Sequence, residues 1–184
     1  MNIFSRAENF IIRKSDSNIL ITAFGIIYFL SQIIIGSIIH PLGVKDALTL
    51  QTTFSSDVFK SIASSWIASG QIGIYYKHFY FDNFHPIWYS IFLSLLIARA
   101  FKINKISSQF NFIILTPFIA AICDFIENMM HLYFLDDLNR ATPLLVALSG
   151  LATNTKWFLA LSGVAIVSIL IGIWIVKTSI TKRK

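Results

Sequence analysis

Apolar residues dominate four stretches of the chain, each long enough to cross a bilayer. A hydrocarbon core of about 30 Å takes roughly 20 helical residues. The pattern predicts spans at approximately 19–39, 79–99, 111–134 and 156–176. Ser17 or Asn18 is the expected N-cap of the first helix. Thr142-Pro143 is expected as the N-cap and first residue of the last helix, which would then be longer than the membrane requires.

A shorter apolar periodicity lies between the first two spans. It predicts an amphipathic helix at approximately 57–70, with Ser56 as its N-cap and Gly70 as its stop. The residues at helical spacing are Val58, Phe59, Ile62, Ala63 and Trp66. We expect this helix to lie on the extracytoplasmic surface of the membrane.

The second span contains a proline near its outer end. Pro86 would lie inside the helix, where its ring would kink the helix and free the carbonyl of Asp82 from its usual partner. Just before this span, His78 is expected to be exposed.

Composition supports an integral membrane protein. The 184 residues are 55% hydrophobic and 13% charged, whereas soluble domains are about 25% charged. The predicted fold class is an all-α integral membrane four-helix bundle with the extra amphipathic helix, and residues 1–184 form one transmembrane domain. The net charge of +6 does not indicate nucleic acid, because the basic residues cluster at the ends of the spans.

The distribution of basic residues predicts the orientation. Ten of the fifteen fall on one side of the predicted spans, and the positive-inside rule makes that side cytoplasmic. They are Arg6, Arg13, Lys14, Arg99, Lys102, Lys105, Lys177, Lys182, Arg183 and Lys184. Both termini are therefore expected in the cytoplasm of a bacterium, with the chain in its cytoplasmic (inner) membrane.

The third span carries a polar row. Asp124, Glu127, Asn128 and His131 are spaced i, i+3, i+4 and i+7, so they share one helical face. Each acid costs roughly 2.5–3.5 kcal/mol to insert at the centre of a membrane helix. The row therefore requires a buried partner, a ligand or a water-filled cavity.

Counting 1.5 Å per residue from the cytoplasmic ends places polar residues of three spans at one depth, near the outer leaflet. This layer contains Asp82, His85, Asp124, Glu127 and Lys156. Lys156 is the expected counter-ion of Glu127 or Asp124. Ionisable residues inside a membrane are candidates for function by default.

We expect this layer to bind a lipid, an isoprenoid or another amphipathic molecule. In an enzymatic version, Asp124 or Glu127 would be the acid/base and His85 would assist. The candidate ligand-binding residues are Asp82, Tyr89, Asn128, His131, Thr153, Lys156 and Trp157. No metal site is predicted, because compact ligand motifs are lacking; His85, Glu127 and His131 are the ligands of a weaker metal hypothesis. The sequence leaves the identity of any cofactor open.

Three alternatives stay open at this point. The cluster could only hold helices together, the chain could be a structural subunit that binds a membrane partner protein or a second copy, or it could be a proton- or ion-coupled carrier. Whether the protein is an enzyme is left undecided.

The order of these motifs resembles that of a group of small bacterial membrane proteins with four hydrophobic segments and no established activity. The resemblance rests on the Asp124-x-x-Glu127-Asn128 element of the third span and the Thr153-x-x-Lys156-Trp157 element of the fourth. It extends back through Tyr89, Pro86, Asp82 and Tyr76 to the segment Leu50-Gln51-Thr-Thr-Phe54. The resemblance implies architecture and no mechanism.

Overall fold

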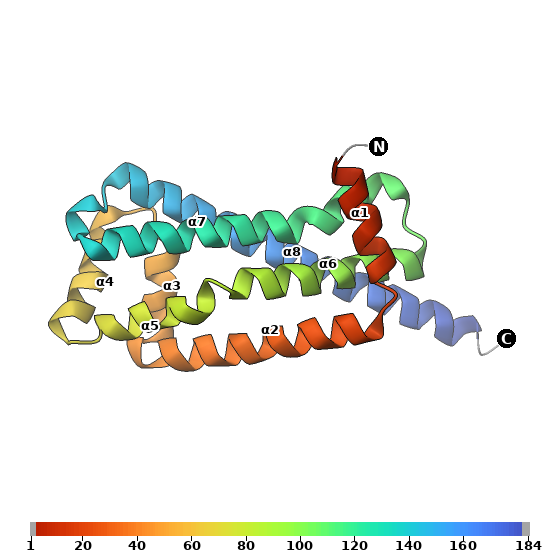
Figure 1. Ribbon diagram of the computed structural model, residues 1–184, viewed down its shortest axis with the longest axis horizontal. Coiled ribbons are helices and arrows are strands. Elements are labelled where there is room, and N and C mark those ends of the chain that lie inside the picture. Colours follow the sequence, from red (N-terminus) through yellow and green to blue (C-terminus); the bar gives the residue numbers. More distant parts are fainter. Residues whose placement is uncertain (1–2, 182–184) are drawn as a thin grey trace.

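The computed structural model describes residues 3–181, and this part of the chain is helical apart from short connections (Figure 1). The α-helices are α1 (Ile3–Lys14), α2 (Asn18–Ile39), α3 (Val44–Thr52), α4 (Ser56–Ala68), α5 (Ile72–Asp82), α6 (His85–Asn104), α7 (Thr116–Asp136) and α8 (Pro143–Thr181). Three 3-10 segments join them: η1 (His40–Leu42), η2 (Ser108–Leu115) and η3 (Leu138–Arg140). The predicted all-α fold class is confirmed.

Within residues 3–181, four helical stretches are long and apolar enough to cross a membrane. They are Asn18–Leu42, His85–Asn104, Ser108–Asp136 and Pro143–Thr181. The helix α6 packs against α2, α7 and α8, and α7 packs along α8. All four stretches run along the long axis of the molecule (Figure 1).

Two sequence signals for helix starts are confirmed. Ser17 Oγ accepts a hydrogen bond from the amide of Leu20 at 3.3 Å, which caps α2. The amide of Leu145 donates to Thr142 Oγ1 at 3.4 Å, and Pro143 is the first residue of α8. The helix α8 then continues without a break past the end of its predicted span.

The helix α1 was not predicted, although Phe4, Ala7 and Ile11 recur at helical spacing. It lies at the same end of the molecule as the end of α8 (Figure 1). The turn after α1 is tied to α6, because Lys102 Nζ lies 2.5 Å from the carboxylate of Asp16. The hydrogen bond from Lys102 holds the pKa of the Asp16 carboxyl below its usual value, so this ion pair persists at neutral pH.

The helices α3, α4 and α5 cover the opposite end of the molecule (Figure 1). The predicted helix 57–70 is α4, which begins at Ser56 and is capped by Ser55 rather than by Ser56. It ends before Gly70, whose φ of +71° reverses the chain.

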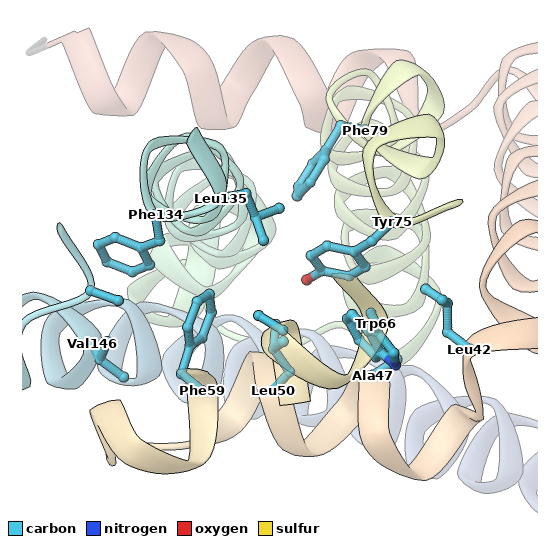
Figure 2. Packing of buried hydrophobic residues seen from close by; sticks show 12 residues of the cluster. Leu42, Ala47, Leu50, Phe59, Trp66, Tyr75, Phe79, Phe134, Leu135 and Val146 are labelled. Atoms are coloured by element: carbon cyan, nitrogen blue, oxygen red, sulfur yellow. The ribbon is translucent and has the colours of Figure 1, made fainter. Parts of the chain in front are cut away.

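The apolar face of α4 does not lie open as a surface helix would. Phe59, Ala63 and Trp66 are buried among residues of α3, α5, α7 and α8, and the ring of Phe59 meets that of Phe134 at 5.3 Å (Figure 2). The pattern did not reveal this because α3 and α5, which enclose α4, are short and only weakly amphipathic.

The predicted span 79–99 is divided between two helices. The helix α5 ends at Asp82 and α6 begins at His85, so Pro86 occupies the first turn of α6 instead of kinking a continuous helix. The proline has the predicted effect on the backbone, because the carbonyl of Asp82 accepts a hydrogen bond from Asn128 Nδ2 at 3.3 Å. The helix break thus connects α5 to α7.

Candidate functional site

The polar row of α7 is buried along its whole length. Asp124, Glu127, Asn128 and His131 are each at most 3% exposed, and they face α5, α6 and α8. Spacing at i, i+3, i+4 and i+7 places them on the one side of α7 that these helices cover. The shared face is confirmed.

Lys156 of α8 is the counter-ion that charge placement predicted, and it serves both acids. Its Nζ lies 2.9 Å from Asp124 Oδ1 and 2.6 Å from Glu127 Oε2. Lys156 is itself only 7% exposed, so the two ion pairs that it makes are shielded from solvent on most sides. Removing one member of such a group leaves an uncompensated buried charge.

One part of the cluster is fully packed, and we call it the closed half. It consists of Glu127, Asn128, His131 and Thr153, which are at most 1% exposed. His131 Nδ1 and the Tyr75 hydroxyl form a hydrogen bond of 2.9 Å. Figure 2 shows that hydroxyl pointing into the apolar cluster between α4 and α7. The closed half therefore continues directly into the hydrophobic core.

The other part lines a cavity of about 550 Å³, and we call it the open half. It consists of Asp82, His85, Tyr89, Asp124, Lys156 and Trp157. The rest of the wall is mainly apolar and comes from α2, α3, α6 and α8. From Lys156 to Ser168, both of which line the cavity, α8 rises about 18 Å. The cavity is thus a long apolar space with one polar end.

The hydrogen bonds of His85 define what it presents to this cavity. Ser31 Oγ donates its proton to the carbonyl of Tyr28 at 2.9 Å, so it can only accept from His85 Nδ1, which lies 2.7 Å away. In the neutral ring, Nε2 is then the unprotonated nitrogen. His85 offers the cavity a hydrogen-bond acceptor.

The same reasoning applies to His78, whose predicted exposure is wrong. This side chain of α5 is fully buried, with its ring centre 4.3 Å from that of Tyr75, and α5 packs mainly against α2. His78 Nδ1 donates to the carbonyl of Tyr75, and burial lowers the pKa of His78 to about 4, so the ring is neutral. Its Nε2 lies 3.8 Å from Asp82 Oδ2 and has no proton to donate. Asp82 is therefore not neutralised by His78.

Only some of the candidate catalytic residues line the cavity. Asp124 and His85, proposed as acid/base and assistant, share the cavity, whereas Glu127 does not reach it. Within residues 3–181, no three His, Cys, Asp or Glu side chains are placed to hold a metal ion, so His85, Glu127 and His131 do not form a ligand set.

Four residues that complete the site were not selected from the sequence. Tyr75 partners His131, Ser31 partners His85, and Tyr28 and Gln51 line the cavity. Ser31 could have been found, since it is followed by Gln32 and these polar residues interrupt the first span. The tyrosines carry no such signal, because tyrosine is common at membrane interfaces.

Comparisons with protein-family models, with curated proteins and with solved structures gave no match to this chain.

Proposed function

We propose that this protein binds an amphipathic molecule of the membrane, with the polar head at the open half and the apolar tail along α2, α6 and α8. The observation that carries the proposal is the cavity of about 550 Å³, which joins a polar end to mainly apolar walls. Ligand sites typically measure about 300–1,000 Å³ and combine apolar walls with a few convergent polar groups.

The head group would decide which molecule binds. A tail gains little by moving from lipid into this cavity, because lipid chains are as apolar as the side chains of the wall. The open half, in contrast, holds buried polar groups that lipid chains cannot satisfy, and leaving such groups unpaired costs free energy. Selectivity therefore resides in Asp82, His85, Asp124 and Lys156.

We further infer a four-helix bundle in a bacterial inner membrane, with both termini in the cytoplasm. The basic residues support this orientation, and α1 and the end of α8 lie together at one end of the molecule (Figure 1). In this arrangement α3, α4 and α5 lie on the extracytoplasmic side. The open half would receive its ligand from the outer leaflet.

The buried contacts within the cluster, in both halves, favour a second role, which is to hold helices together. The ion pairs of Lys156 with Asp124 and Glu127 connect α7 to α8, and the bond between His131 and Tyr75 connects α7 to α5. These contacts hold helices together while the open half binds. If the ligand is transformed, Asp124 and His85 are the groups placed to exchange protons with it.

Native mass spectrometry of the detergent-purified protein, with extraction of any bound amphiphile, tests the proposal. Ala160→Trp would fill the cavity from α8, whereas Ala165→Trp is a matched change on the same helix away from the cavity wall. We expect the wild type and Ala165→Trp to retain an amphiphile at about one per chain and Ala160→Trp to lose it. Equal retention in all three proteins would overturn the proposal.

A further inference from the structure

We propose that the head group of the ligand is a protonated amine, so that the cavity selects cationic amphiphiles over neutral and anionic ones. This inference rests on the proposed function and assigns its ligand a chemical class. Three independent features of the open half lead to it: the balance of charge, the supply of hydrogen-bond acceptors and the aromatic wall.

The charge balance favours a cation. Asp82, Asp124 and Glu127 are all at least nine-tenths buried, and the single ammonium among them belongs to Lys156. Lys156 is in contact with Asp124 and Glu127, and in residues 3–181 no Lys or Arg lies within ion-pair distance of Asp82. A buried carboxylate at the edge of a cavity needs a positive partner. A ligand cation would supply it.

Three acceptors lie at the polar end of the cavity, beside the Tyr89 hydroxyl and the Trp157 indole N–H, which can donate. The carboxylates of Asp82 and Asp124 accept only, and His85 Nε2 is an acceptor because its Nδ1 proton is held by Ser31. The one ammonium of the open half already donates to Asp124. An alkylammonium head carries three N–H donors and no acceptor, as a lysine side chain does, and therefore complements this set.

Aromatic rings complete the polar end. Trp157 lines the cavity with part of its ring exposed, and the Lys156 ammonium lies 5.7 Å from the centre of that ring. Tyr28 also lines the cavity and stacks on His85 with ring centres 5.4 Å apart. Tryptophan and tyrosine faces attract cations. A phosphate or carboxylate head would meet instead two carboxylates and ring faces of negative potential, and the one ammonium of the open half, that of Lys156, is already paired with Asp124 and Glu127.

Three probes of equal chain length test this assignment: dodecylamine, dodecanol and dodecanoate. Each is titrated into the purified protein in neutral maltoside micelles at pH 7.5, and one-to-one adducts are counted by native mass spectrometry. We expect dodecylamine to bind at least about tenfold more tightly than dodecanoate, with dodecanol between them.

Asp82→Asn removes the carboxylate that no Lys or Arg of residues 3–181 contacts and preserves the shape of the side chain. It should lower the affinity for dodecylamine about tenfold or more and leave that for dodecanol within about twofold. Asp57→Asn is the matched control, since Asp57 is an exposed acid in the first turn of α4, away from the cavity. It should leave all three affinities unchanged.

The possible outcomes distinguish a failure of the amine assignment from a failure of the proposed function. Dodecanoate binding as tightly as dodecylamine in the wild type overturns the amine assignment, whether or not Asp82→Asn folds. Binding of all three probes that persists in Ala160→Trp shows that the probes do not enter this cavity, which overturns the proposed function itself. Loss of dodecylamine binding in both Asp82→Asn and Ala160→Trp, but not in Asp57→Asn, supports both.

Discussion

The closed and open halves of the polar cluster contain the same kinds of residue and have different surroundings. Glu127 and Asp124 stand three residues apart on α7 and contact the same lysine, yet only Asp124 borders the cavity. His131 and His85 each hydrogen-bond through Nδ1, to Tyr75 in the packed interior and to Ser31 beside the cavity. The kind of side chain therefore does not separate structural from binding residues. The two halves differ instead in whether a cavity borders the side chain.

This difference has an energetic consequence. A change in the closed half has no space in which to relax, so its cost should appear in the free energy of unfolding. A change in the open half faces a cavity, so its cost should appear in binding, except at Lys156, whose ion pairs with Asp124 and Glu127 join the two halves and contribute to stability. Each variant below tests whether the two halves differ in this way.

The largest effect on stability is expected for Lys156→Met. The substitution leaves Asp124 and Glu127 side by side without their shared ammonium, and breaking a buried pair typically costs about 3–5 kcal/mol. Thermal unfolding in detergent should show a large drop in Tm. Adding Asp124→Asn and Glu127→Gln should recover most of it, because no buried charge is then unpaired. A Tm of Lys156→Met equal to that of the wild type would contradict the ion-pair description.

Gly150→Ala should be the next most damaging change. A Cβ atom on Gly150 of α8 would overlap the carbonyl oxygen of Thr53, which belongs to the link between α3 and α4. Overpacking of this kind costs about 1–3 kcal/mol. Gly172→Ala is the control, because no neighbouring atom lies within 4 Å of a Cβ built there. The control should match or slightly exceed the wild type in Tm, and equal losses in both variants would show that the tight contact at Gly150 is not responsible.

A loss of similar size is expected for Tyr75→Phe. The change removes the hydroxyl that bonds His131 at 2.9 Å and leaves a buried imidazole nitrogen unpaired, at a cost of about 1–3 kcal/mol. Binding of the amphiphile should be unaffected, because neither Tyr75 nor His131 lines the cavity. The matched change in the open half is Tyr89→Phe, which should alter binding more than stability. If Tyr75→Phe altered mainly binding and Tyr89→Phe altered mainly stability, the closed and open halves would not differ in the way described.

Much of this arrangement could be predicted from local patterns. Length and hydropathy located four apolar stretches, and spacing put Asp124, Glu127, Asn128 and His131 on one face. The estimated depth of Lys156 in the membrane and its charge predicted that it would pair with Asp124 or Glu127. These inferences succeeded because helical rise and buried charge impose strong, local constraints.

The rest depends on tertiary packing that a single sequence does not encode locally. The division between the closed and open halves follows from the cavity, whose wall comes mainly from α2, α3, α6 and α8, and no spacing rule predicts how these helices meet. Burial of His78 depends on the packing of its own helix, α5, against α2 and other helices distant in the sequence. For Pro86, the sequence predicted the freed carbonyl of Asp82 but not the complete helix break, since a kink and a new helix start satisfy the same steric constraint.

The smallest effect on stability, and the sharpest test of the open half, is expected for Gly36→Leu. Gly36 lines the cavity from α2, and no neighbouring atom lies within 4 Å of a Cβ built there, so a leucine can extend without a clash. Leucine favours a helix over glycine by up to about 1 kcal/mol, so the free energy of unfolding should rise slightly or stay constant. Occupancy by the amphiphile, measured by native mass spectrometry, should nevertheless fall, because the side chain takes space from the tail. Gly172→Leu should give the same small change in stability and leave occupancy intact. If Gly36→Leu instead destabilised the protein as Gly150→Ala is expected to, the space beside α2 would be packed, and the open half would be a structural site like the closed one.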